Sequence, residues 1–152
     1  MKMKRIRMIS LFFVLGIALT ILIFSAQNGE KSGNSSEQIT EKFLEIFGGE
    51  NISSGAFLSL ETIIRKLAHF FEYYILSAAL YIFVWTYGRR LLFTISVSFF
   101  GTVLYALTDE FHQYFVPERQ ASFWDVLLDT GGALCGVLTV MLIMHLILRK
   151  KG

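Results

Sequence analysis

Cysteine, proline and charged side chains are all scarce in this chain. Its 152 residues include one cysteine, Cys135, and one proline, Pro117. A lone cysteine excludes an internal disulfide, and its place in an apolar run is typical of a small packing residue. Only 17% of the residues are charged, whereas 54% are hydrophobic. That balance excludes an ordinary soluble domain and predicts an integral membrane protein.

Several familiar catalytic and binding patterns are also absent. The sequence shows no Ser/His/Asp order, no HExxH or CxxC motif, no P-loop and no dinucleotide-binding glycine pattern. Its net charge of +2 is small and divides between the two sides of a membrane, so we expect no nucleic-acid partner. No reaction is therefore indicated by a motif alone.

Four apolar runs are long enough to cross a hydrocarbon core, which requires about 20 helical residues. We expect one membrane domain over 1–152, an all-α four-transmembrane-helix bundle, with spans at about 7–24, 62–87, 91–115 and 123–148. The first run is longer than the roughly 7–15 apolar residues of a cleaved signal peptide, so we favour an uncleaved anchor.

Residues that typically begin or end helices predict the bounds of the spans. Ser59, with Thr62 in the first turn, can cap the second span, and Gly88 can end it. Pro117 is expected to stop the third span.

The polar segment 25–59 contains one amphipathic stretch. Ser35 with Gln38 forms a capping-box pattern, and Gly48-Gly49 predicts a helix end. Apolar residues between them recur at helical spacing: Ile39, Phe43, Ile46 and Phe47. This pattern predicts a short extracytoplasmic helix that lies on the membrane surface or covers the bundle, and a plain linker is the alternative.

Basic residues predict the orientation of the bundle. One side of it receives Lys2, Lys4, Arg5, Arg7, Arg89, Arg90, Arg149, Lys150 and Lys151. The other side receives all 12 acids, together with Lys31, Lys42, Arg65, Lys66 and Arg119. Because cytoplasmic loops carry the excess of Lys and Arg, we expect both termini in the cytoplasm and the ionisable cluster facing outward.

Polar residues follow one face of three of the expected helices, at about 100° per residue. The second span carries Thr62, Lys66, His69, Tyr73 and Ser77, with Glu72 at the border of the stripe. The third carries Ser98, Thr102, Tyr105, Asp109, His112 and Gln113, with Glu110 farther round. The fourth carries Asp125, Asp129, Gly132 and Gly136, and this glycine pair allows a neighbouring helix to approach closely. Ionisable groups are costly at membrane depth, so we expect the three stripes to meet at one polar cavity.

Two kinds of ligand suit such a cavity. Lys66 and Arg119 can bind a phosphate or carboxylate, which fits a lipid phosphate. A divalent metal ion is the other candidate cofactor. Asp109 and His112 have the i, i+3 spacing that helical bundles use for metals, and further donors are available: His69, Glu72, Asp125 and Asp129.

Proton chemistry is a third reading of the same cavity. His69 or His112 can act as general base or acid, with a carboxylate that fixes its tautomer. The alternative is purely structural, because polar side chains between spans also join helices and contribute about 0.6 kcal/mol each. Eight ionisable residues together exceed what packing requires: Lys66, His69, Glu72, Asp109, His112, Arg119, Asp125 and Asp129.

Two stretches of the sequence resemble the VanZ-like family of small bacterial membrane proteins. They read RKLAHFFEYYILSAALY and DEFHQYFVPERQASFWDVLLDTGGALCG. The family pattern falls on Lys66, His69, Glu72, Tyr73, Asp109, Glu110, Gln113, Arg119, Asp125, Asp129 and Gly132. Two residues depart from it: Glu118 stands where a Gly often precedes the Arg, and Asp129 stands where Asn is common.

The resemblance implies a multi-pass protein of the bacterial plasma membrane. The family is named for a member that lowers susceptibility to the glycopeptide teicoplanin. From the convergence of the three polar stripes, we expect an anionic envelope lipid or a polyprenyl-phosphate-linked precursor as ligand, and either its hydrolysis or a non-enzymatic binding or accessory role. A proton-coupled transporter fits less well because the chain shows no internal repeat, and it would require a homo-oligomer or another partner.

The expected site combines three sets of residues. The catalytic set is His69, Glu72, Asp109, His112 and Asp125. The ligand-binding set is Lys66, Tyr73, Glu110, Gln113, Arg119 and Asp129. The metal set is Asp109, His112, Asp125 and Asp129.

Overall fold

The computed structural model describes residues 2–47, 52–119 and 121–149, and helices account for nearly all of this part of the chain. The helices are α1 (Lys2–Ser25), α2 (Gly29–Phe47), α3 (Ser54–Trp85), α4 (Leu91–Gln113) and α5 (Phe123–Arg149). Four of them, α1, α3, α4 and α5, are long and apolar enough to cross a membrane. The predicted all-α fold with four spans is confirmed.

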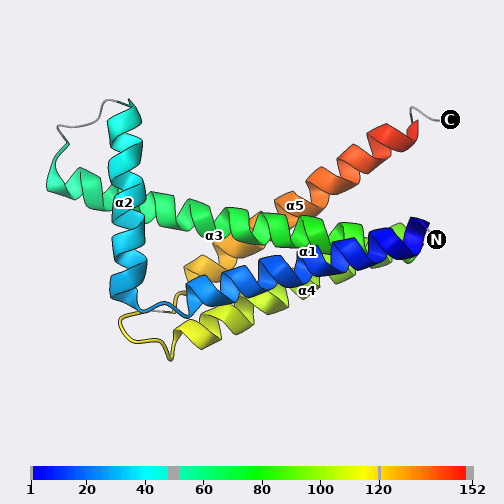
Figure 1. Ribbon diagram of the computed structural model, residues 1–152, viewed down its shortest axis with the longest axis horizontal. Helices are drawn as coiled ribbons and strands as arrows, with labels where there is room; N and C mark the ends of the chain where they lie inside the picture. Colours follow the sequence, from blue (N-terminus) through cyan, green and yellow to red (C-terminus); the bar gives the residue numbers. More distant parts are fainter. Residues whose placement is uncertain (1, 48–51, 120, 150–152) are drawn as a thin grey trace.

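Helix α3 is the centre of the bundle, since each of the other four helices packs against it. Figure 1 shows both termini at one end of the long axis, while α2 crosses α3 near the opposite end. Arg7 joins the start of α1 to the end of α3, because its guanidinium donates to the Thr86 carbonyl oxygen at 3.0 Å and lies over the Tyr87 ring. Helices α1 and α3 are therefore antiparallel neighbours.

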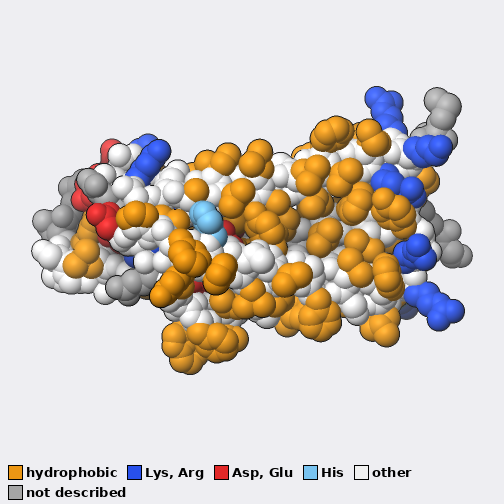
Figure 2. All heavy atoms as spheres, turned by 90° about the horizontal axis from the view of Figure 1, so that it is seen from below, with side chains coloured by type: hydrophobic (Ala, Val, Ile, Leu, Met, Phe, Trp, Pro, Cys, Tyr) orange, Lys and Arg blue, Asp and Glu red, His pale blue; other side chains and the backbone are white. Residues whose placement is uncertain are grey.

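The interior is small and largely polar, whereas the outer surface is apolar. Ile21, Tyr73, Leu76 and Ala106 form the buried apolar cluster. Large apolar side chains cover most of the length of the molecule, with only Lys and Arg among the charged side chains seen at one end, and Asp and Glu together with some Lys and Arg at the other (Figure 2). An outer surface of this kind requires contact with lipid rather than water.

Two glycines of α5 bring it against α3. A Cβ atom at Gly132 would collide with the Phe70 carbonyl oxygen, and one at Gly136 would collide with the Tyr74 carbonyl oxygen. The predicted close approach at this glycine pair is confirmed, and α3 is the helix that makes it.

Three helices begin earlier than predicted, and the first of them, α1, begins at Lys2 rather than at about residue 7. Helix α3 begins at Ser54, where the Ser53 hydroxyl accepts from the Ala56 amide at 3.3 Å, and Ser59 lies within the helix. Several serines precede this span, and the first of them serves as the cap. Gly88 has a φ of 62°, consistent with its predicted role just beyond the end of the helix.

Helix α2 likewise begins at Gly29 rather than at the predicted capping box. The Asn28 side chain accepts from the Lys31 amide at 3.1 Å, and the Ser35 hydroxyl donates back to the Lys31 carbonyl inside the helix. The predicted stop at Gly48-Gly49 lies outside the described residues. Because α2 is a helix of 19 residues, the alternative of a plain linker is wrong.

Candidate functional site

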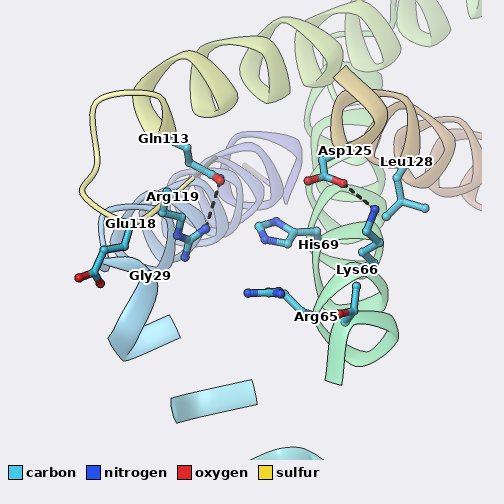
Figure 3. Close-up of a pocket in the computed structure, with 10 residues that line it drawn as sticks. Gly29, Arg65, Lys66, His69, Gln113, Glu118, Arg119, Asp125 and Leu128 are labelled. Atoms are coloured by element: carbon cyan, nitrogen blue, oxygen red, sulfur yellow. Dashed lines mark hydrogen bonds and ion pairs between the residues drawn. The ribbon is translucent and has the colours of Figure 1, made fainter. Parts of the chain in front are cut away.

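A polar cavity of about 300 Å³ lies at the end of the bundle away from the termini (Figure 3). Four of the five helices and the loop between α4 and α5 contribute to its wall. The lining residues are Gly29, Thr62, Arg65, Lys66, His69, Gln113, Glu118, Arg119, Asp125 and Leu128. Cationic side chains from α3 and from the loop between α4 and α5 therefore surround one cavity.

The helical period of α3 explains its share of the wall. Thr62, Lys66 and His69 follow one another at spacings of four and three residues, so they lie on one face. The Lys66 ammonium pairs with an Asp125 oxygen of α5 at 3.1 Å, and the two side chains are 48% and 30% exposed. The predicted anion-binding lysine thus already has a carboxylate partner at the edge of the cavity.

Arg65 is a lining residue that the sequence analysis missed. Its guanidinium makes no hydrogen bond or ion pair with the described residues, and it points into the same space as His69 and Arg119 (Figure 3). A signal for it existed, because Arg65 stands four residues before His69 and so adjoins the polar stripe. Of the three lining cations, it is the one most available to a ligand.

Most of the hydrogen-bond donors of Arg119 bind other residues of the protein. Its guanidinium donates to the Gln27 carbonyl at 3.2 Å, the Phe24 carbonyl at 3.1 Å, the Ser32 hydroxyl at 3.0 Å and the Gln113 side-chain oxygen at 3.1 Å. A guanidinium has five N–H donors, so one remains. Arg119 therefore joins the end of α1, the start of α2 and the end of α4, and only a small part of it can reach a ligand.

A buried network continues from Arg119 into the bundle. One Asp109 oxygen accepts from the Tyr73 hydroxyl at 3.0 Å and from the Gln113 amide at 2.9 Å. Burial lowers the pKa of Arg119, and the Asp109 carboxylate opposes that shift. Arginine nevertheless stays protonated in proteins. Gln113 thus connects Arg119 to the buried Asp109 and Tyr73, and this network fixes the position of Arg119. Of the three residues, only Gln113 lines the cavity.

The turn that presents Arg119 has an unusual backbone. Glu118 has a φ of 62°, in the left-handed region that favours glycine. This explains why a glycine at this position suits the family pattern. The Pro117 carbonyl accepts from the Gly29 amide at 3.2 Å, and a Cβ atom at Gly29 would collide with the Glu118 backbone. The loop and the start of α2 therefore fit together only with glycine at position 29.

Three other predicted site residues lie away from the cavity. Glu110 is buried, and its carboxylate accepts from the Ser122 amide at 2.9 Å, directly before α5. Asp129 is 2% exposed, and one of its oxygens has no partner among the described residues. The same holds for the Nδ1 atom of His112. None of the three lines the cavity, so their predicted catalytic or ligand-binding roles are not supported by direct access to it.

The predicted metal set is not assembled. Within residues 2–47, 52–119 and 121–149, no group of three or more His, Cys, Asp or Glu side chains has an arrangement that could hold a metal ion. Asp125 pairs instead with Lys66, and Asp109 accepts hydrogen bonds from Tyr73 and Gln113. The i, i+3 spacing of Asp109 and His112 was insufficient to predict a metal site, because at least three donors from different helices must also converge.

His69 and Glu72 form the one close contact between a His and a carboxylate that is found in the described part of the chain. The His69 Nδ1 and Glu72 Oε2 atoms are 3.5 Å apart, and the side chains are 23% and 26% exposed. Both line a second cavity of about 180 Å³, between α3 and the segment that runs from Phe24 to Ile39. This cavity shares Arg65, His69 and Arg119 with the first. Of the predicted catalytic residues, His69, Glu72 and Asp125 therefore line a cavity.

Fold and site together define a polytopic helical membrane protein with a polar pocket at one end of its bundle. The family model described as VanZ/LLP1 matches residues 10–145. The chain belongs to this family, which confirms the resemblance. No curated protein and no solved structure gave a significant match.

Proposed function

We propose that the polar pocket binds the anionic head group of an envelope lipid or lipid-linked precursor. The observation that carries this proposal is the convergence of Arg65, Lys66 and Arg119 on one cavity of about 300 Å³, at the end of an apolar bundle. Its volume lies at the lower end of the range of about 300–1,000 Å³ that is usual for ligand pockets. A phosphate group suits such a cavity because guanidinium and ammonium groups make charge-assisted hydrogen bonds to its oxygens.

The three cations have different roles in this proposal. Arg65 makes the principal contact, since its guanidinium has no partner among the described residues. Lys66 has three donors, so it can bind an oxygen of the ligand while it stays close to Asp125. Arg119 holds the walls together and offers its remaining N–H group. His69 is a further donor at the floor of the site.

The pocket faces outward in this proposal, and both termini are cytoplasmic. Supporting it, the end opposite the pocket carries basic residues from two helices and one loop: Lys4, Arg5, Arg7, Arg89, Arg90 and Arg149. An excess of Lys and Arg marks the cytoplasmic side. The ligand is then a lipid of the outer leaflet of a bacterial plasma membrane.

Removing the two α3 cations tests the binding proposal. We expect Arg65→Gln combined with Lys66→Gln to weaken the binding of phosphatidylglycerol, relative to phosphatidylcholine, by about 10-fold or more, because each charge-assisted hydrogen bond contributes about 1.5–3 kcal/mol. Binding is measured with the purified full-length protein in lipid nanodiscs. Arg89→Gln combined with Arg90→Gln is the matched control at the other end. Equal loss in both pairs, or no loss in the first, would contradict the proposal.

A hydrolytic step on the bound phosphate is the second candidate function, and the His69–Glu72 pair favours it. Neutral His69 would accept a proton from water as that water attacks phosphorus, and the leaving alcohol would take up the proton afterwards. We expect His69→Ala to abolish release of the alcohol while the lipid stays bound. His145→Ala, at the cytoplasmic end, is the control. If no product forms even with the parent protein, a purely binding role remains.

A lowered susceptibility to teicoplanin-type glycopeptides belongs to this proposal as a consequence. A protein that holds or consumes a lipid-linked precursor changes the amount of precursor exposed at the outer face. The effect should therefore depend on Arg65 and Lys66.

A further inference from the structure

An apolar groove runs along the lipid-facing side of α1 and α3. Its volume is about 680 Å³, and its walls are α1 residues from Ile9 to Ile21 together with Glu72 and Ile75 of α3. Phe12 and Phe13 on its rim are 67% and 66% exposed, so the groove opens sideways toward the surrounding lipid.

Gly16 keeps the middle of this groove open. No atom lies within 4 Å of the position that its Cβ would take, whereas Gly132 and Gly136 meet the backbone of α3. A glycine inside a helix is less favourable than alanine by about 1 kcal/mol. Helix packing does not require this glycine, and its missing side chain leaves space in the groove.

Glu72 connects the groove to the polar site. It lines the groove and also the cavity of about 180 Å³, which shares Arg65, His69 and Arg119 with the main pocket. Because α1 and α3 are antiparallel, Glu72 lies at the groove end near Ile21, on the side of the pocket. A carboxyl group in a lipid-facing wall is costly, and groups in such places are usually functional. The groove therefore ends at an ionisable pair that belongs to the site.

The length of the groove suits one hydrocarbon chain. From Ile9 to Ile21 the helix rises by about 18 Å. Half of a typical hydrocarbon core is about 15 Å, which is the depth of the chains in one leaflet. A chain that lies in the groove would thus have its polar end beside Glu72 and His69, next to the cations.

We propose that the groove takes one hydrocarbon chain of the anionic lipid whose head group lies in the pocket, and that this lipid enters sideways from the outer leaflet between α1 and α3. The inference rests on the proposed function and adds the route and the chain-binding subsite. Glu72 and His69 lie at the junction of head group and chain.

Photocrosslinking with the full-length protein in bilayers tests this route. The probe is a phosphatidylglycerol that carries a diazirine near the methyl end of one chain. We expect adducts on α1 between Ile9 and Gly16, and a fall in their yield of about 10-fold or more in Gly16→Trp, because Gly16 lines the groove, its Cβ position is open, and an indole there would fill the groove. Leu15→Trp is the control, since Leu15 is 55% exposed and does not line the groove.

The outcomes separate the groove from the pocket. If head-group binding depends on Arg65 and Lys66 but adducts spread evenly over α1, α4 and α5, the groove proposal is overturned while the pocket proposal stands. Adducts that are equally strong with phosphatidylcholine overturn the link between groove and pocket. A change of oligomeric state in Gly16→Trp, without loss of adducts, would show a helix-docking surface and also overturn the proposal.

Discussion

At the scale of single residues, Arg65 and Arg119 differ in their contacts although both line the same cavity. Arg119 donates to three helices or their ends, whereas Arg65 has no partner among the described residues. The contacts of Arg119 join separate segments, whereas Arg65 makes no hydrogen bond or ion pair within the described part of the chain. Substitutions at the two positions should therefore affect different properties.

Arg119→Lys should lower stability more than Arg65→Lys. A lysine has a single nitrogen and cannot reach the Phe24, Gln27 and Gln113 oxygens together, so the part-buried oxygens of Gln27 and Gln113 would lose a donor. Each unsatisfied buried group costs about 1–3 kcal/mol. Thermal unfolding of the detergent-solubilised protein measures the difference. Equal melting temperatures for the two variants would show that Arg119 is not a structural connector.

Residue by residue, the sequence predicted part of the site. Lys66, His69, Gln113, Arg119 and Asp125 were predicted and do line the cavity. Periodicity placed the four helical residues correctly, because one face of a helix follows from spacing alone, whereas Arg119 was predicted from its charge. Spacing could not show that Arg119 donates hydrogen bonds to backbone carbonyl groups of distant segments. It also could not show that Arg65, at the edge of the stripe, faces open space. Both facts depend on how separate helices meet.

At the scale of the elements, the fit of α5 against α3 fixes one wall of the pocket. Gly132 and Gly136 let the two backbones approach, and the same packing brings Asp125 to Lys66. The sequence predicted this approach from the glycine spacing. It predicted helix starts less well, because Ser53, Ser54 and Ser59 all offer a cap and only tertiary packing selects between them.

Gly136→Ala should loosen this pair of helices. The added methyl group would collide with the Tyr74 carbonyl and the Ser77 hydroxyl, and overpacking of this kind costs about 1–3 kcal/mol. Gly55→Ala is the control, because no atom lies within 4 Å of that Cβ position. We expect a lower melting temperature and weaker phosphatidylglycerol binding for Gly136→Ala alone. A Gly136→Ala protein as stable as the control would contradict the close packing.

At the scale of the whole molecule, charge is divided between the two ends of an apolar bundle. Figure 2 shows Lys and Arg without acids at one end, and Asp and Glu mixed with Lys and Arg at the other. The four spans were predictable because length and hydropathy are properties of local sequence. The depth of the polar pocket and the groove beside α1 were not, since they arise where non-adjacent segments leave space.

The orientation makes a prediction for intact cells. In a Cys135→Ser background, Ser35→Cys on α2 should react with a membrane-impermeant maleimide added outside, because Ser35 is exposed near the pocket. Arg90→Cys, at the basic end, should react only after the cells are lysed. The opposite pattern of labelling would place the pocket in the cytoplasm and exclude an outer-leaflet ligand.

The most direct test of the account is native mass spectrometry of the full-length protein, purified in mild detergent from a bacterial membrane without added lipid. We predict that one anionic phosphate-containing lipid stays bound to each chain, and that the combined Arg65→Gln and Lys66→Gln variant retains much less of it. A parent protein that carries no lipid, or only a zwitterionic lipid retained equally by the variant, would contradict the claim that the pocket binds an anionic head group.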